Sequence, residues 1–177
     1  MLITISGLAG SGTTTVSRLV AEALKLERVP GGEVFRQMAA EAGMSLAEFG
    51  AYAQDHPHID QELDRRLVQR AEDGHCVMES RLAGWLATRA GLPAVRAWID
   101  CSEAVRAERV ALRDGTSTEQ AIVDNKVRAD LERARYLAVY DIDIEDRAVY
   151  DLVLDSTDAR PADLADVILA RAGTTFP

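Results

Sequence analysis

The sequence predicts an α/β fold in which a five-stranded parallel sheet carries helices on both faces. Short apolar runs, each long enough for one buried strand, recur along the chain and alternate with longer segments of helical periodicity. A glycine-rich turn follows the first of these runs. Strands that alternate with helices are typical of a parallel sheet, because each crossover needs a connection long enough for a helix.

The expected strands are the apolar runs, and helical segments fill the gaps between them. The strands are predicted at 2–6, 26–29, 75–79, 95–100 and 150–155. The helices are predicted at 13–26, 33–42, 45–55, 59–73, 82–90, 102–113, 117–139 and 161–172. Ser45 with Glu48 three residues later has the pattern of a capping box, and Pro57 fits the first turn of a helix. We expect the 177 residues to form a single domain without a linker.

The composition disfavours several classes of function. The formal net charge of −9 argues against non-specific binding to nucleic acid or to anionic membranes. No run of 18 apolar residues is present, and the first ten residues lack the basic region of a signal peptide. We therefore expect a cytoplasmic protein whose partners are small molecules, with no role for nucleic acid or membrane. We also expect a monomer.

The segment after the first strand has the pattern of a P-loop, with one departure. The residues Gly7-Leu-Ala-Gly-Ser-Gly12-Thr13-Thr14 match GxxxxGK[ST] except at the lysine, and a strand precedes and a helix follows them, as the motif requires. Backbone N–H groups and the positive end of the helix would bind phosphate oxygens. A glycine-rich turn that binds nothing is the structural alternative. We expect an ATP site with Mg²⁺ on the Thr14 hydroxyl, formed by Gly7, Leu8, Ala9, Gly10, Ser11, Gly12, Thr13, Thr14 and Thr15.

Position 13 carries threonine where the motif usually has lysine. That lysine reaches the β- and γ-phosphate oxygens, so this chain needs catalytic cations from another segment. Arg128, Arg133 and Arg135 on the predicted helix 117–139 are the candidates. Arg128 and Arg135 are seven residues apart and share a face of this helix, whereas Arg133 is offset around it. An ordinary helix with Glu/Arg pairs is the alternative.

Two arginines follow neighbouring strands of the predicted sheet. Arg36 comes after the second strand and Arg81 after the third. In open α/β sheets ligands bind beyond the carboxyl ends of the strands, and the planar guanidinium group suits a phosphate. Each arginine alone would be an ordinary surface charge. Together, beside a phosphate loop, they predict a clamp for the phosphate of an acceptor monophosphate.

These segments, in this order, resemble the P-loop nucleoside monophosphate kinases, and most closely the cytidylate kinases of the archaeal type. The similarity extends from residue 1 to about 172 and is carried by segments 7–15, 32–36, 59–66, 79–85, 128–135 and 151–157. The resemblance implies a core with a helical acceptor-binding insert at about 33–73 and a short lid at about 113–136. It implies transfer of a phosphoryl group from ATP to CMP, and also to dCMP, with Mg²⁺ as the cofactor.

The predicted helix 59–73 carries the candidates for binding the cytosine base. Cytosine offers an N4 donor and N3 and O2 acceptors, which a carboxylate beside an arginine can bind. Asp60 and Asp64 are four residues apart and share a face of the helix, and Arg65 is adjacent to them. Solvated helix charges are the alternative.

Two other functions remain open on the sequence. One is a kinase for another small acceptor, such as AMP or UMP. The other is a nucleotide-binding module without catalysis, which the threonine at position 13 suggests. A regulatory GTPase is disfavoured, because no NKxD motif is present and no aspartate ends the third strand.

Overall fold

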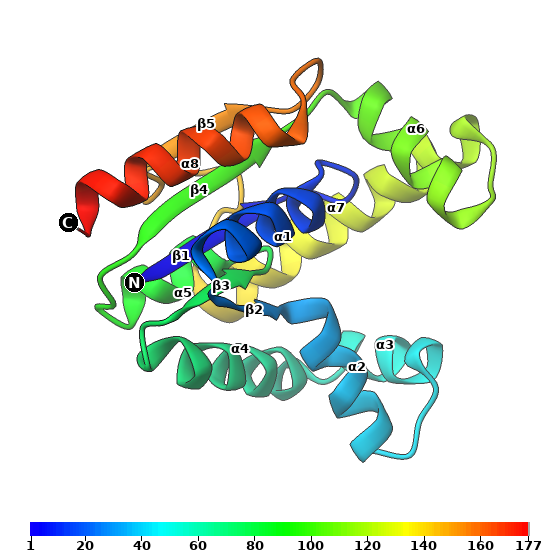
Figure 1. Cartoon of the computed structure of the whole chain (residues 1–177). Helices are drawn as coiled ribbons and strands as arrows, with labels where there is room; N and C mark the ends of the chain where they lie inside the picture. The colour runs from blue at the N-terminus through cyan, green and yellow to red at the C-terminus, as the bar shows by residue number, and fades with distance from the viewer. Residues whose placement is uncertain (177) are drawn as a thin grey trace.

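In the computed structural model, which describes residues 1–176 apart from the side chains of Leu46 and Ala47, five parallel strands form one sheet in the order β2-β3-β1-β4-β5 (Figure 1). Ile5 of β1 is in register with Glu79 of β3 and with Ala97 of β4, so the carboxyl ends of the strands share one edge. The predicted fold class is confirmed. The strands are β1 (Leu2–Gly7), β2 (Glu27–Pro30), β3 (Cys76–Glu79), β4 (Val95–Asp100) and β5 (Leu152–Asp155).

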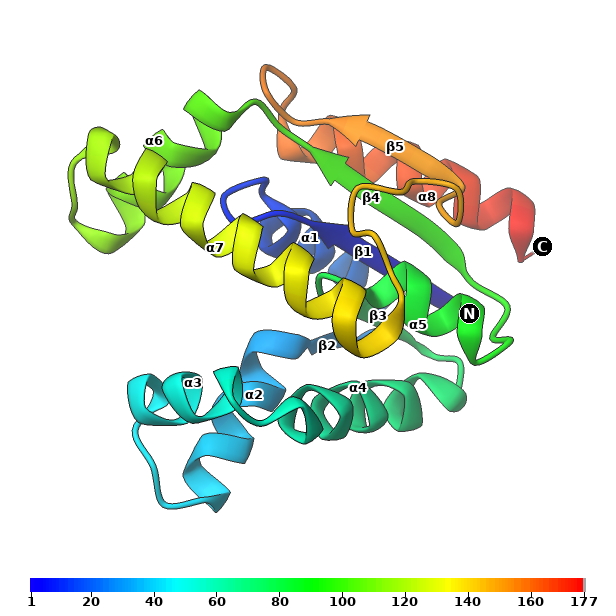
Figure 2. The ribbon, with the colours of Figure 1, turned by 180° about the vertical axis from the view of Figure 1, so that it is seen from behind.

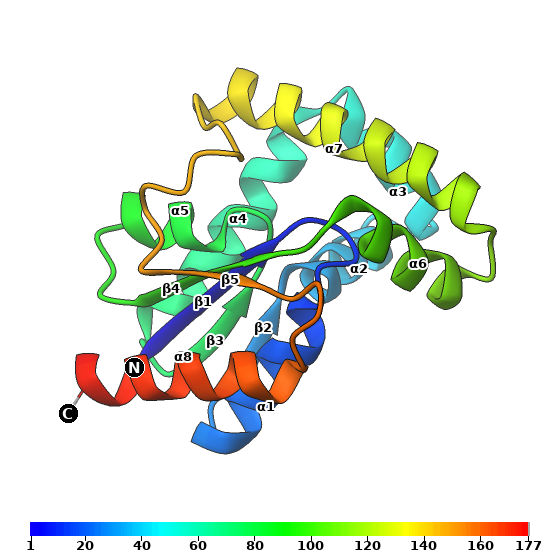
Figure 3. The ribbon, with the colours of Figure 1, turned by 90° about the horizontal axis from the view of Figure 1, so that it is seen from above.

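Helices cover both faces of the sheet (Figure 3). Helices α1 (Thr13–Leu24) and α8 (Pro161–Thr175) lie on one face, and α5 (Ala83–Arg89) and α7 (Thr118–Tyr140) lie on the other. Successive residues of a strand point to opposite faces. Trp98 of β4 therefore lies in the core beneath α5 and α7, whereas Ile99 lies in the core beneath α1 and α8.

Three helices lie between β2 and β3, where the sequence predicts the acceptor-binding insert. They are α2 (Gly31–Glu41), α3 (Leu46–Gln54) and α4 (Pro57–Glu72), and they lie together at the β2 edge of the sheet (Figure 1). The rings of Phe35 and Phe49 pack with their centroids 5.0 Å apart and join α2 to α3. The predicted capping box of Ser45 and Glu48 is present, and Pro57 is the first residue of α4.

Helix α6 (Glu103–Asp114) and α7 form a hairpin between β4 and β5 (Figure 2). Gly115, with φ 70°, ends α6, and the Ser117 side chain caps α7 by accepting from the Gln120 amide. Helix α7 then runs back across the sheet, and its carboxyl-terminal end lies near α5 (Figure 2). The predicted lid, 113–136, comprises the turn of this hairpin and most of α7. No helix among residues 1–176 is long and apolar enough to cross a membrane.

Candidate functional site

The turn after β1 has the backbone conformation of an anion-binding loop. Gly10 and Gly12 have φ angles of 83° and 91°, which residues with a side chain rarely adopt. A Cβ on Gly10 would lie 2.4 Å from the carbonyl oxygen of Arg106, so a larger residue would also clash there. Helix α1 begins at Thr13, and its first amides have no partner within the helix. An anion at this turn would meet backbone N–H groups and the positive end of α1.

Arg109 and Ser156 hold this loop from the outside. The Nη1 atom of Arg109, on α6, donates to the carbonyl oxygen of Gly10 at 3.4 Å and to Ser156 Oγ at 3.1 Å. Its Nη2 atom donates to the carbonyl oxygen of Ser156 at 2.7 Å. The buried Ser156 hydroxyl in turn donates to the carbonyl oxygen of Ser11 at 2.7 Å. These bonds tie the loop to α6 and to the end of β5.

Glu79, at the end of β3, binds the hydroxyls of the first turn of α1. Thr13 Oγ1 and Thr14 Oγ1 both donate to Glu79 Oε1, at 3.0 and 2.7 Å. Ser17 Oγ donates to Oε2 at 2.9 Å, and Arg28 Nη1 of β2 donates to the same oxygen at 3.2 Å. The threonine at position 13 therefore offers no cation to a phosphate, and its hydroxyl helps to fix α1 against β3.

Arg81 lies in an ion-pair network beneath α7. Its Nε donates to Glu132 Oε2 at 2.8 Å, and its Nη1 donates to the carbonyl oxygen of Gly7 at 2.9 Å. Arg128 Nε donates to the other carboxylate oxygen of Glu132 at 2.8 Å. Burial opposes ionisation of Glu132, which is 8% exposed, but the two guanidinium groups hold the pKa of its carboxyl below the ordinary value. An ionised, buried carboxylate thus joins two arginines beside the end of β1.

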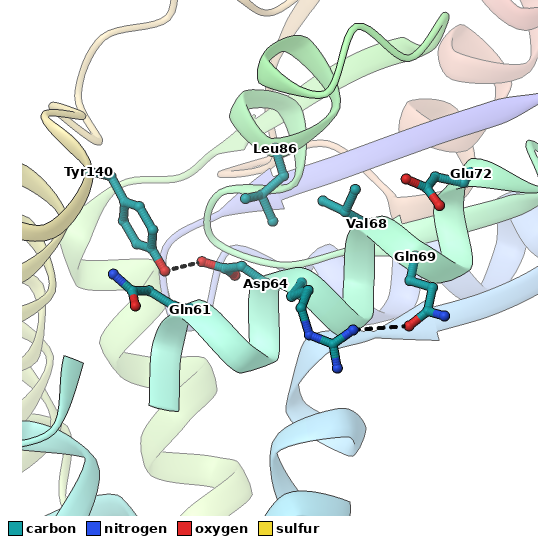
Figure 4. Close-up of a pocket in the computed structure, with 8 residues that line it drawn as sticks. Gln61, Asp64, Val68, Gln69, Glu72, Leu86 and Tyr140 are labelled. Atoms are coloured by element: carbon teal, nitrogen blue, oxygen red, sulfur yellow. Dashed lines mark hydrogen bonds between the residues drawn. The ribbon is translucent and has the colours of Figure 1, made fainter. Parts of the chain in front are cut away.

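Asp60 and Asp64 on α4 both face α7. Asp60 Oδ2 lies 3.0 Å from Arg135 Nε, and Asp64 accepts a hydrogen bond from the Tyr140 hydroxyl at 2.5 Å (Figure 4). Burial raises the pKa of both carboxyls, and that of Asp64 rises to about 6. Asp64 and Tyr140 also line a groove of about 440 Å³, which lies between α4, α5 and the end of α7.

The sequence matches that of known proteins over nearly its whole length. The model of the cytidylate kinase-like family matches residues 2–158. The chain belongs to this family. A cytidylate kinase of Pyrococcus horikoshii is 47% identical over 170 residues, which cover 96% of this chain and 87% of the relative. A cytidylate kinase of Thermococcus sibiricus is 44% identical over 177 residues, which cover 100% of this chain and 90% of the relative.

Solved structures share the fold of this member of the cytidylate kinase-like family. An uncharacterized protein from Eubacterium ventriosum superposes with a TM-score of 0.75 at 18% identity, covering 98% of this chain and 99% of the other. Shikimate kinase from Acinetobacter baumannii gives a TM-score of 0.63 at 16% identity, covering 99% of this chain and 94% of the other. At these identities the likeness concerns the fold alone, and it agrees with the predicted P-loop kinase architecture.

Several predicted site residues of this family member come together at the carboxyl edge of the sheet. The phosphate loop and Arg81 are joined by the bond between Arg81 and Gly7, and Arg128 enters the same network through Glu132. Arg135 contacts Asp60, so the predicted catalytic cation and the predicted acceptor residue are paired with each other. The roles assigned to these residues stay predictions.

Three other predicted site residues lie outside this network within residues 1–176. Arg133 contacts Asp143 and Glu145, in the segment after α7, at 3.1 and 2.9 Å. Arg65 is paired with Glu62 of its own helix at 2.8 Å. Arg36 is exposed on α2. To bind a substrate, Arg65 and Arg133 would have to leave these carboxylates, and the roles of all three residues stay predictions.

The sequence interpretation missed Glu79, Glu132 and the contacts of Arg109. Glu79 was detectable, because it ends the predicted strand 75–79 on the edge where the phosphate loop lies. Arg128 and Glu132 form a visible i,i+4 pair, but such pairs are usually exposed. The burial of Glu132 depends on the packing of α7 against the sheet, which local sequence does not reveal.

Proposed function

We propose that the chain transfers a phosphoryl group from ATP to CMP, and to dCMP, giving ADP and CDP or dCDP. The observation that carries this proposal is the bond between Arg81 and the phosphate loop, which sets an arginine network beside an anion-binding turn. The cytidylate kinases at 44–47% identity support cytosine as the acceptor base. We also propose that the protein acts as a monomer in the cytoplasm.

The donor ATP is proposed to bind through loop 7–15. Within residues 1–176 no group of three or more His, Cys, Asp or Glu is placed to hold a metal ion. A hydroxyl and a carboxylate lie together at the loop, since Thr14 Oγ1 is 2.7 Å from Glu79 Oε1. These hard oxygen donors fit Mg²⁺, which binds through few protein groups and the substrate phosphates. Bound Mg²⁺ would neutralise β- and γ-phosphate oxygens.

Arginines are proposed to replace the missing loop lysine. Phosphoryl transfer places charge on the equatorial oxygens of the transferred group, so cations fixed there lower the barrier. We assign this role to Arg128, Arg133 and Arg135. Arg128 has the strongest support, because it shares a carboxylate with Arg81. Arg133 and Arg135 would exchange their present carboxylate partners for phosphate oxygens.

The acceptor is proposed to bind between α2, α4 and the start of α5. Arg36 and Arg81 would bind its phosphate, and the carboxylates of α4 would bind its base. Asp60, which Arg135 would release on moving to the phosphate, would accept a hydrogen bond from cytosine N4. Asp64 and Arg65 are proposed to complete this surface of α4.

An acceptor panel tests the proposal. CMP, dCMP, UMP, AMP and GMP would each be offered with ATP, and ADP release would be measured in a coupled assay. CMP and dCMP should give the highest kcat/KM, with AMP and GMP lower by about 10²-fold or more, because a site built to hydrogen-bond one base rejects others strongly. AMP turnover comparable to that of CMP would refute the cytosine assignment. Turnover of no monophosphate would favour the nucleotide-binding module.

Replacement of Arg81 separates acceptor binding from donor binding. Arg81→Ala should raise the acceptor KM and lower kcat, while the KM for ATP stays within about twofold. Arg89→Ala, an exposed arginine at the end of α5, is the matched control and should behave like the wild type. A defect of Arg81→Ala confined to the KM for ATP would place this arginine on the donor side.

A further inference from the structure

We infer that Glu132 is a positioning residue, which fixes Arg81 and Arg128 through their Nε atoms and presents the Nη groups of Arg81 to the acceptor phosphate and those of Arg128 to the transferred phosphoryl group. The inference rests on the proposed function, which assigns Arg81 to the acceptor phosphate and Arg128 to the transferred phosphoryl group. Glu132 carries the same sign of charge as the phosphate. Its effect on the acceptor therefore has to act through the arginines.

The geometry of the three side chains supports this role. The Nε of each arginine donates a hydrogen bond to a different carboxylate oxygen of Glu132, and both distances are 2.8 Å. A guanidinium group has five N–H donors. Arg81 uses one on Glu132 and one on the carbonyl oxygen of Gly7, which leaves three, and Arg128 uses one on Glu132, which leaves four. One carboxylate thus orients two guanidinium groups and keeps most of their donors for a ligand.

The charges favour the same conclusion. Arg81 precedes α5 and Arg128 belongs to α7, so two segments far apart in the sequence each bring one positive charge to this place. Without Glu132 the two guanidinium groups would repel each other, and solvent would screen this repulsion only in part, because the side chain of Arg81 is 20% exposed and that of Arg128 is 56% exposed. With Glu132 ionised, the three groups carry a net charge of about +1. This arrangement is stable without a ligand and still attracts a dianionic phosphate.

The opposite arrangement is a carboxylate that occupies the place of the phosphate and leaves when the acceptor binds. Both arrangements contain the same ion pairs, but they predict opposite effects of removing the charge. A displaced carboxylate competes with the acceptor, so its removal would tighten acceptor binding. A positioning carboxylate supports the arginines, so its removal would weaken acceptor binding.

Steady-state kinetics of Glu132→Gln distinguish the two arrangements. The KM for CMP should rise by about tenfold or more and kcat should fall, while the KM for ATP stays within about twofold. Glu132→Asp keeps the charge and should give an intermediate KM for CMP. Asp130→Asn, an exposed carboxylate two residues away on α7, is the matched control and should match the wild type. An unchanged or lowered KM for CMP in Glu132→Gln would overturn the inference.

A double-mutant cycle tests whether Glu132 acts through Arg81. Introduced into Arg81→Lys, Glu132→Gln should raise the KM for CMP by less than about twofold, because its target is already lost. Additive effects would overturn the positioning role. If Glu132→Gln does not fold, Glu132→Asp decides, and a wild-type KM for CMP in that variant overturns the inference. Wild-type protein that phosphorylates no monophosphate refutes the proposed function, whereas active wild type with an unaffected Glu132→Gln refutes this inference alone.

Discussion

Position 13, where the P-loop motif usually has a charged lysine, carries a threonine in this chain. Its side chain is one of four that donate hydrogen bonds to the carboxylate of Glu79, together with those of Thr14, Ser17 and Arg28. Thr13→Ala removes one of these donors and no cation, so kcat should fall by about tenfold or less. The measurement is kcat with saturating ATP and CMP.

In contrast to Thr13→Ala, replacement of the arginines proposed as catalytic should lower kcat strongly. Arg128→Ala, Arg133→Ala and Arg135→Ala should each lower kcat by about 10²-fold or more, because each removes a proposed transition-state cation. Thr13→Lys should not fully rescue Arg128→Ala, since an ammonium group cannot reproduce the guanidinium fork. Arg18→Ala, exposed on α1, is the control. A severe defect of Thr13→Ala beside near-normal arginine variants would mean that the catalytic charge is assigned to the wrong side of the phosphate.

Asp64 makes stability depend on pH. Burial raises the pKa of its carboxyl from 3.8 to about 6 in the folded chain, so the folded state holds a proton that the unfolded state has lost. Stability from this group is present below about pH 4 and is lost as the pH rises to about 6. Asp64→Asn removes the titration and keeps an oxygen that can accept from Tyr140. The free energy of unfolding of Asp64→Asn relative to wild type should increase between pH 4.5 and 7, by at most about 3 kcal/mol.

Urea unfolding at each pH measures this difference. Asp130→Asn, exposed on α7, should show a difference from wild type that stays flat over the same range. A flat difference for Asp64→Asn as well would show that Asp64 has an ordinary pKa in the folded protein.

Among the elements, the phosphate loop depends on contacts from α6 and from the end of β5. The Ser156 hydroxyl donates a hydrogen bond to the carbonyl oxygen of Ser11 and accepts one from Arg109. Ser156→Ala should raise the KM for ATP several-fold and lower the free energy of unfolding by about 1 kcal/mol, because a buried hydrogen bond is lost and the loop loosens. Thr174→Ala, whose hydroxyl bonds within the last turn of α8, is the control. Lower stability with an unchanged KM for ATP would mean that the hydrogen bonds of Ser156 stabilise the fold but do not affect ATP binding.

Sequence alone predicts the elements well because each carries a local signal. The alternation of apolar runs with helical segments defines the sheet, and the capping box at Ser45 marks the start of α3. The phosphate loop is equally local, since its glycines, strand and helix are contiguous. For such features, neighbouring residues decide the conformation, and the structure shifts the bounds by only a few residues.

The partners of the arginines could not be predicted in the same way. Arg81 meets Glu132 across 51 positions, and the contact depends on how α7 crosses the sheet. Periodicity places Arg128 and Arg135 on one face of α7 but does not say which element that face meets. The sequence shows that Arg133 is offset around α7 from Arg128 and Arg135. Its contacts with Asp143 and Glu145 depend on the path of the chain after α7, which the sequence does not show. Local sequence signals therefore predict the strands and helices, whereas the contacts of the site residues depend on long-range packing.

On the scale of the whole molecule, two helical parts flank the carboxyl edge of the sheet, one formed by α2, α3 and α4 and the other by α6 and α7 (Figure 1). They touch through Asp60 with Arg135 and through Asp64 with Tyr140. Phosphoryl transfer competes with hydrolysis, so a kinase must exclude water when both substrates are bound. A rigid sheet between two helical parts suits such a closure.

We therefore expect segments 33–73 and 113–136 to close together over the two substrates. Hydrogen exchange with a bisubstrate analogue, in which a polyphosphate joins adenosine to cytidine, should show protection in both segments. The same measurement with an ATP analogue alone should protect mainly the loop after β1, because only the acceptor is proposed to contact α2 and α4. Protection by the bisubstrate analogue that is confined to the loop would contradict closure. Protection of 33–73 alone would mean that α7 already occupies its final position, and that Arg133 then stays with Asp143 and Glu145 during the reaction.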